Sequence, residues 1–142
     1  MAITTAMSNS FKRELLAALH HFAASGGNQF KVALFSAAAT LNKDTTVYAA
    51  TDEVSGTGYT AGGGNLTAID PVLSGDTAYT SFANFTWPSS TITARGCHIY
   101  NSTNSNRSVS THLFDAEKTS SDGDFTIIFP TADASNAILR LV

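Results

Sequence analysis

The sequence predicts a mainly β protein: a single antiparallel β-sandwich, jelly-roll-like or immunoglobulin-like in outline, with one N-terminal α-helix. Apolar and polar residues alternate along most of the chain after residue 28. Turn-forming Gly, Pro, Asn and Ser separate these stretches, and only one stretch has helical periodicity. With 142 residues the chain is long enough for one domain with its own core. We expect a single domain, 1–142, with an N-terminal arm (1–9), a helix (10–25) and strands (29–142).

The chain begins with an uncharged arm that has no clear helix or strand pattern. Ordering such an arm costs about 1–2 kcal/mol of backbone entropy per residue. We therefore expect it to be disordered in an isolated domain and to be held by a neighbouring subunit in an assembly. The predicted interface residues are Met1, Ala2, Ile3, Thr4, Thr5, Ala6 and Met7.

A helix is predicted from Ser10 to Ala24, where apolar residues recur on one face. Ser8 or Ser10 can cap its start, and Glu14 places a carboxylate in the first turn. Gly26 and Gly27 supply a left-handed stop. His20 and His21 point about 100° apart on a helix, so we expect surface residues there rather than a metal site.

Strands follow, organised around a hairpin from Thr91 to Phe114. Its first arm is broken in step at Arg95 and Gly96, which indicates a bulge, and a polar turn follows from Asn101 to Asn106. The other predicted strands are Gln29–Phe35, Thr45–Ala50, Asn65–Ile69 (stopped by Asp70–Pro71), Thr77–Trp87 (ended by Pro88), Phe125–Phe129 and Ala137–Val142. The predicted core is Phe30, Val32, Leu34, Leu66, Phe85, Trp87, Ile99, Leu113, Phe125, Ile127 and Leu139.

Composition and charge exclude several classes of function. The net charge is −3 and the eight Lys and Arg residues are scattered, so we expect no nucleic-acid binding. There is no apolar run of membrane-spanning length, and we expect no membrane association. Charged residues make up 13% of the chain, roughly half the usual ~25%, so the surface is predicted to be rich in hydroxyl groups instead.

Three patterns are weak candidates for chemistry. The glycine-rich stretch 56–64 lacks the Lys and the following helix of a phosphate-binding loop. The acidic stretch Asp115–Asp124 lacks the order of a calcium loop and is predicted to be a solvated loop between strands. Cys97 is the only cysteine, predicted to be buried, and cannot form a dyad with its strand neighbour His98. We therefore predict no enzyme activity, no metal and no cofactor.

The segments EVSGTGYTAGG, TARG followed by IYNS, and FPTAD carry a resemblance that covers nearly the whole chain. On these segments the chain resembles a family of small virion structural proteins of tailed bacteriophages. Where the family usually has Ala-Leu after TARG, this chain has Cys97-His98. The resemblance implies a non-enzymatic virion component, assembled in the host cytoplasm, whose partners are other virion proteins and further copies of itself.

Two virion roles and one other class are consistent with this reading. The first role is a capsid decoration or cement protein that stabilises the head. The second is a tail, baseplate or fibre-associated module that contacts the host surface or another tail protein. The class outside the virion is an enzyme or carbohydrate-binding module, which would need a polar constellation that the sequence does not offer.

Overall fold

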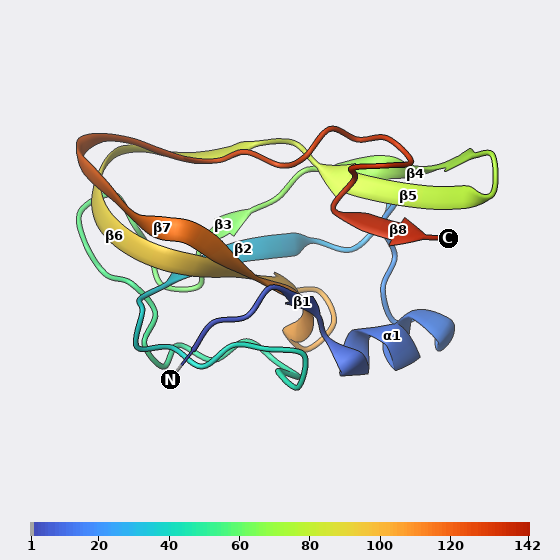
Figure 1. Ribbon diagram of the computed structural model, residues 1–142, viewed down its shortest axis with the longest axis horizontal. Coiled ribbons are helices and arrows are strands. Elements are labelled where there is room, and N and C mark those ends of the chain that lie inside the picture. Colours follow the sequence, from blue (N-terminus) through green and yellow to red (C-terminus); the bar gives the residue numbers. More distant parts are fainter. Residues whose placement is uncertain (1) are drawn as a thin grey trace.

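The computed structural model describes residues 2–142 and is mainly β, with two antiparallel sheets and one short helix (Figure 1). The elements are β1 Ala6–Met7, α1 Asn9–Leu16, β2 Phe30–Phe35, β3 Gly64–Asn65, β4 Ala68–Ser74, β5 Thr77–Phe82, β6 Phe85–Asn101, β7 Arg107–Ile127 and β8 Leu139–Leu141. One sheet has the order β1-β7-β6-β2-β3, and the other has the order β4-β5-β8.

Strand β2 lies inside the larger sheet and is buried on both faces, as its apolar second face predicted. It pairs with β6 from Phe30 opposite Asn101 to Phe35 opposite Gly96. Its other edge pairs with the two-residue strand β3. All of its residues except Lys31 are buried.

Strands β6 and β7 form a long hairpin, which confirms the predicted hairpin and extends it at both ends. The pairing shifts register between Trp87 and Ser90 and again between Ala94 and Gly96. Bulges of this kind bend and twist a strand. At the shift between Ala94 and Gly96 the Arg95 guanidinium donates to the Phe114 carbonyl. The hairpin folds over on itself, so that its two halves lie in different layers (Figure 1).

Two prolines that were expected to end strands lie inside strands instead. Pro71 is part of β4, because a register shift between Ile69 and Val72 removes it from the regular ladder. Pro88 is part of β6 and lies in the shift that follows Trp87. A bulge accommodates a residue that has no N–H donor. Each strand therefore continues through its proline, and both predicted strand ends are wrong.

The predicted strand from Thr77 to Trp87 is two strands that belong to different sheets. Strand β5 ends at Phe82 and β6 begins at Phe85. The side-chain oxygen of Asn84 accepts a hydrogen bond from the Phe129 N–H at 2.8 Å. Because of this break, Phe82 and Phe85 belong to different sheets although they are close in the sequence.

Helix α1 is shorter than predicted: it ends at Leu16, eight residues before the predicted end at Ala24. Ala18 has φ 58°, and the N–H groups of Ala18 and Leu19 donate to the carbonyls of Leu15 and Glu14. This hydrogen-bond pair ends the helix in the way a glycine usually does. Apolar periodicity continued past this point because Phe22 also packs in the core, from an irregular segment; it stacks on Phe30 with ring centroids 4.4 Å apart.

The start of the helix also differs from the prediction. Ser8 occupies the N-cap position, but its side chain makes no capping hydrogen bond. It is instead fully buried against Ser108, with 2.6 Å between the two Oγ atoms. Glu14 lies beyond the first turn, which contains no acidic residue.

Most of the predicted core is confirmed. Phe85 is half-buried and packs against the core, and the other exception is Leu113, which is 41% exposed. Regular alternation ends at Leu113, because the register shift opposite Arg95 follows it. The buried members of the predicted core are Phe30, Val32, Leu34, Leu66, Trp87, Ile99, Phe125, Ile127 and Leu139.

Two further segments differ from the prediction. Thr45–Ala50 is not a strand; Val47 forms only an isolated bridge with Arg107 and is 48% exposed. Asp115–Asp124 is not a loop but part of β7. Hydroxyl pairs across the hairpin support this part of the strand, such as Thr93 with Thr119 at 3.0 Å between Oγ1 atoms. Such pairs leave no apolar alternation in the sequence.

Candidate functional site

The N-terminal arm, predicted to be an interface, packs on its own chain. Ile3 is 5% exposed and lies in a cluster with Phe35, Leu41 and Tyr100. The Thr4 N–H donates to the Leu41 carbonyl at 2.8 Å, and β1 pairs with β7. The expectation that the arm is disordered without a neighbouring subunit is therefore wrong for its described residues.

The outer side of the arm is still open to a partner. Ala2, Thr4 and Thr5 are exposed, and the two residues of β1 are half-buried. Met1 lies outside the described residues. A contact of this arm with a second subunit stays a prediction.

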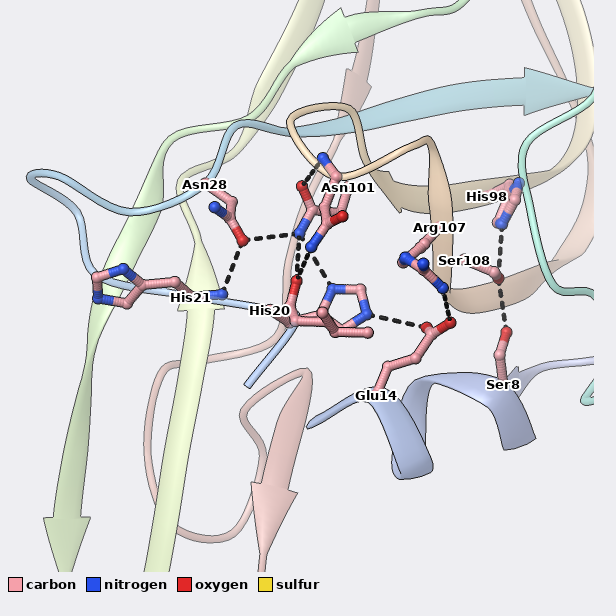
Figure 2. Close-up of polar contacts among 11 residues, drawn as sticks. Ser8, Glu14, His20, His21, Asn28, His98, Asn101, Arg107 and Ser108 are labelled. Atoms are coloured by element: carbon pink, nitrogen blue, oxygen red, sulfur yellow. Dashed lines mark hydrogen bonds and ion pairs between the residues drawn. The ribbon is translucent and has the colours of Figure 1, made fainter. Parts of the chain in front are cut away.

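Figure 2 shows a buried polar cluster that joins α1 to the turn between β6 and β7. Glu14 is ion-paired with Arg107, with 2.7 Å between Oε2 and Nη1, and its Oε1 lies 3.1 Å from His20 Nε2. The Asn101 amide lies 3.1 Å from His20 Nδ1 and donates to Asn28 Oδ1 at 2.9 Å. Burial lowers the pKa of His20 and outweighs the opposing effect of Glu14. His20 was expected at the surface, and that prediction is wrong. Asn101 accepts a hydrogen bond from the Asn104 N–H in the predicted turn, but its buried side chain also takes part in this cluster.

A second buried chain of polar groups runs from Ser8 through Ser108 to His98 (Figure 2). Ser108 Oγ lies 2.8 Å from His98 Nε2. Burial, followed by the nearby His112, lowers the pKa of His98 to about 4. All three side chains are fully buried, so the hydroxyl and imidazole groups present no surface to a substrate. Burial also raises the pKa of the neighbouring Cys97 thiol to about 12, which makes it unreactive.

The irregular segment between β2 and β3 is organised by one carboxylate. Glu53 accepts hydrogen bonds from the hydroxyls of Tyr48 and Tyr59 at 2.5 and 2.6 Å and from the Gly62 N–H at 2.8 Å. Burial and this carboxylate raise the pKa of both tyrosines. The arrangement fixes the segment to the sheet, because the Leu34 N–H donates to the Tyr59 hydroxyl at 2.9 Å.

Residues 2–142 contain no group of three or more His, Cys, Asp and Glu side chains placed to hold a metal ion. The acidic side chains from Asp115 to Asp124 are exposed along β7, and Asp115 pairs with Lys118 at 2.7 Å. In the same described part of the chain, no helix is long and apolar enough to cross a membrane.

The feature best suited to binding is an apolar groove between α1 and the three-stranded sheet, which we call the α1–β8 groove. Its volume is about 290 Å³. Arg140 is the only Asp, Glu, Lys or Arg residue that lines it. Its main apolar walls come from Phe11 and Leu15 of α1, Ala78 of β5, and Leu139 and Leu141 of β8.

Exposed apolar side chains gather around this groove. Leu73 pairs with Ala78, and Ala78 pairs with Leu141, so the three form a row across the sheet. Leu73 is 73% exposed and Leu141 is 57% exposed, while Leu16 at the end of α1 is 92% exposed. In Figure 1, α1 and this sheet lie at the same end of the molecule, with β8 between β5 and α1. Clustered apolar surface of this kind marks an interaction site.

The outer edge of β8 is free. It pairs only with β5, and no other main-chain hydrogen bond to Leu139–Leu141 occurs among residues 2–142. The rest of β7, beyond its short pairing with β1, is also an edge, but it carries four acidic residues and a bulge. Charges and bulges prevent strand pairing. In β8, by contrast, Arg140 is the only charged residue.

Sequence reasoning missed this groove, since it assigned Leu15 and Leu139 only to a helix face and the core. The sequence offers only a weak signal of it: Leu16 and Val142 are apolar at positions off the faces of Leu15 and Leu139. Comparison of the chain with protein-family models, with curated proteins and with solved structures finds no match.

Proposed function

We propose that this protein is a non-enzymatic structural component of a tailed-phage virion, and that it is a capsid decoration protein that stabilises the head. It works by binding neighbouring protein subunits and is present in many copies. The observation that carries the protein-binding part is the exposed α1–β8 groove beside a free strand edge. The virion assignment is supported by the resemblance of the EVSGTGYTAGG, TARG and FPTAD segments to small virion proteins.

The finer fold assignment belongs to the same proposal. Two antiparallel sheets and a folded hairpin enclose one large apolar cluster, which supports an antiparallel β-sandwich of jelly-roll-like or immunoglobulin-like outline. A hydroxyl-rich surface with 13% charged residues suits a protein whose partners are other protein surfaces. The predicted arm interface adds a second contact surface at Ala2, Thr4 and Thr5.

The copy number of the chain in purified particles tests the proposal. Quantitative mass spectrometry should give a copy number proportional to that of the major capsid protein. A copy number that follows the symmetry of the tail would instead support a tail, baseplate or fibre-associated module. Absence from intact particles would contradict both roles.

A pair of variants connects the groove to assembly. Leu141→Asp places a charge at the mouth of the groove and should prevent loading onto particles, because burying an unpaired carboxylate is costly. Ile128→Asp is a matched control, since Ile128 is 76% exposed and lies outside the groove. Both variants should remain folded, and normal loading of Leu141→Asp would show that the groove is not used.

A further inference from the structure

We propose that the α1–β8 groove binds an extended segment of a partner protein, which adds a strand to the free edge of β8. The proposal rests on the proposed function, in which the groove binds protein. The segment places large apolar side chains in the groove and an acidic side chain opposite Arg140.

The first argument is the main chain of β8. Its N–H and C=O groups on the side away from β5 have no main-chain partner within residues 2–142. An extended peptide satisfies such groups by pairing with the edge. The other edge of the same sheet, β4, contains Pro71 and a register shift, which interrupt pairing. The β8 edge is therefore the accessible one in this sheet.

The second argument is the position of the groove beside that edge. Three residues of β8 offer few main-chain hydrogen bonds, so the side chains of the bound segment must supply most of the affinity. Successive side chains of a strand point to opposite faces. Leu139 and Leu141 share the face that lines the groove. The bound residues opposite them therefore point into an apolar space of about 290 Å³.

The third argument is charge. Arg140 is exposed and makes no ion pair among residues 2–142, although it lies close enough to Asp133 to help lower the pKa of that exposed carboxyl group. Its Nη1 donates to the Ala134 carbonyl at 3.3 Å. Opposite charges across two strands stabilise the pair, and like charges destabilise it. A second copy paired symmetrically about Arg140 would set Arg140 against Arg140. The groove thus favours a segment of a different protein, in which one acidic residue lies between two apolar residues.

Two labelled peptides test this inference: acetyl-Ser-Thr-Phe-Glu-Leu-Thr-Ser-amide and the same peptide with Lys in place of Glu. NMR titration of the full chain should show binding of the Glu peptide with slowed hydrogen exchange at the β8 amides. The Glu peptide should bind up to about fivefold more tightly than the Lys peptide, as one cross-strand ion pair implies. Arg140→Glu should reverse this order, a result that a purely structural role of Arg140 does not predict.

Two further variants locate the site. Ala78→Trp fills the groove and should weaken both peptides, whereas Asp124→Lys on the β7 edge should change neither. The inference is overturned if neither peptide binds at concentrations on the order of 1 mM, or if binding leaves β8 exchange unchanged. Self-association that Leu141→Asp abolishes would also overturn it, in favour of a second copy. Peptide binding and particle copy number are measured independently, so either proposal can fail without the other.

Discussion

Glu14 of α1 and Arg107 at the start of β7 are 93 residues apart in the chain and form an ion pair with 2.7 Å between Oε2 and Nη1. Glu14 is 3% exposed and the Arg107 side chain is 32% exposed. The pair therefore fixes the helix, which forms one wall of the α1–β8 groove, to the β6–β7 hairpin.

Removing this carboxylate should destabilise the fold. Glu14→Gln leaves the Arg107 cation partly buried without its partner. We expect a loss of about 2–3 kcal/mol in the free energy of unfolding, below the ~3–5 kcal/mol of a fully buried pair because Arg107 is partly hydrated. Urea denaturation of the variant and of wild type measures this loss in the free energy of unfolding. Asp115→Asn is the matched control, because the Asp115–Lys118 pair is exposed and its loss should not change the midpoint. Equal midpoints for both variants would contradict the structural role of Glu14.

Acid should destabilise the protein through His98. Its pKa of about 4 when folded is below the ordinary 6.5, so the folded state binds fewer protons than the unfolded state. The stability that neutral His98 contributes is therefore complete above about pH 6.5 and is lost as the pH falls toward 4, by about 3 kcal/mol. Burial also lowers the pKa of His112 to about 4, so this side chain adds to the loss.

Denaturation of wild type and of His98→Gln across this range measures that effect. The variant should start less stable and lose less stability on acidification. His21→Asn is the control for replacing a histidine at an exposed position. A His98→Gln profile parallel to wild type would argue against the buried neutral imidazole.

The N-terminal arm should contribute to the stability of its own domain. Ile3→Ala removes a side chain that is 5% exposed and should cost about 2–4 kcal/mol. Thr4→Ala, at an exposed position of the same arm, should cost much less. Thermal denaturation of the two variants decides the point, and wild-type stability in Ile3→Ala would indicate that the arm is only loosely held.

The glycine-rich stretch should be intolerant of a side chain at Gly63. Gly63 has φ +79°, and a Cβ there would lie 1.8 Å from the Val32 carbonyl oxygen. Gly63→Ala should therefore displace the segment from β2 and greatly lower the melting temperature. Gly26 has φ +80° with nothing within 4 Å of a Cβ, so Gly26→Ala isolates the backbone cost alone, about 1 kcal/mol. Similar losses in both variants would exclude a role for close packing.

The sequence predicted the elements whose stability comes from apolar burial. Leu66 and Phe125 alternate with polar neighbours, and both are buried where the pattern put them. Prediction from the sequence failed where hydrogen bonds, rather than apolar burial, determine the structure. The acidic half of β7 is paired through hydroxyl groups, and Ala18 ends α1 in a left-handed conformation that glycine normally takes. Neither feature leaves a periodic signal.

The candidate groove was not predictable for a related reason. Leu141 and Leu139 have the same hydrophobicity and lie on the same face of β8, yet Leu139 is 7% exposed and Leu141 is 57% exposed. The lengths of α1 and of the small sheet contribute to which of them the core reaches. Those lengths depend on contacts between residues far apart in the chain.

The folded β6–β7 hairpin has a consequence for how the molecule opens. Each of its strands crosses from one layer to the other, so the layers cannot separate without breaking the hairpin itself (Figure 1). The amide protons of β2 and of both hairpin halves that donate between strands should therefore exchange with solvent only through complete unfolding, with a common free energy of opening. The hairpin also pairs with strands from distant parts of the sequence, β7 with β1 and β6 with β2, which makes folding slow compared with helical proteins of equal length.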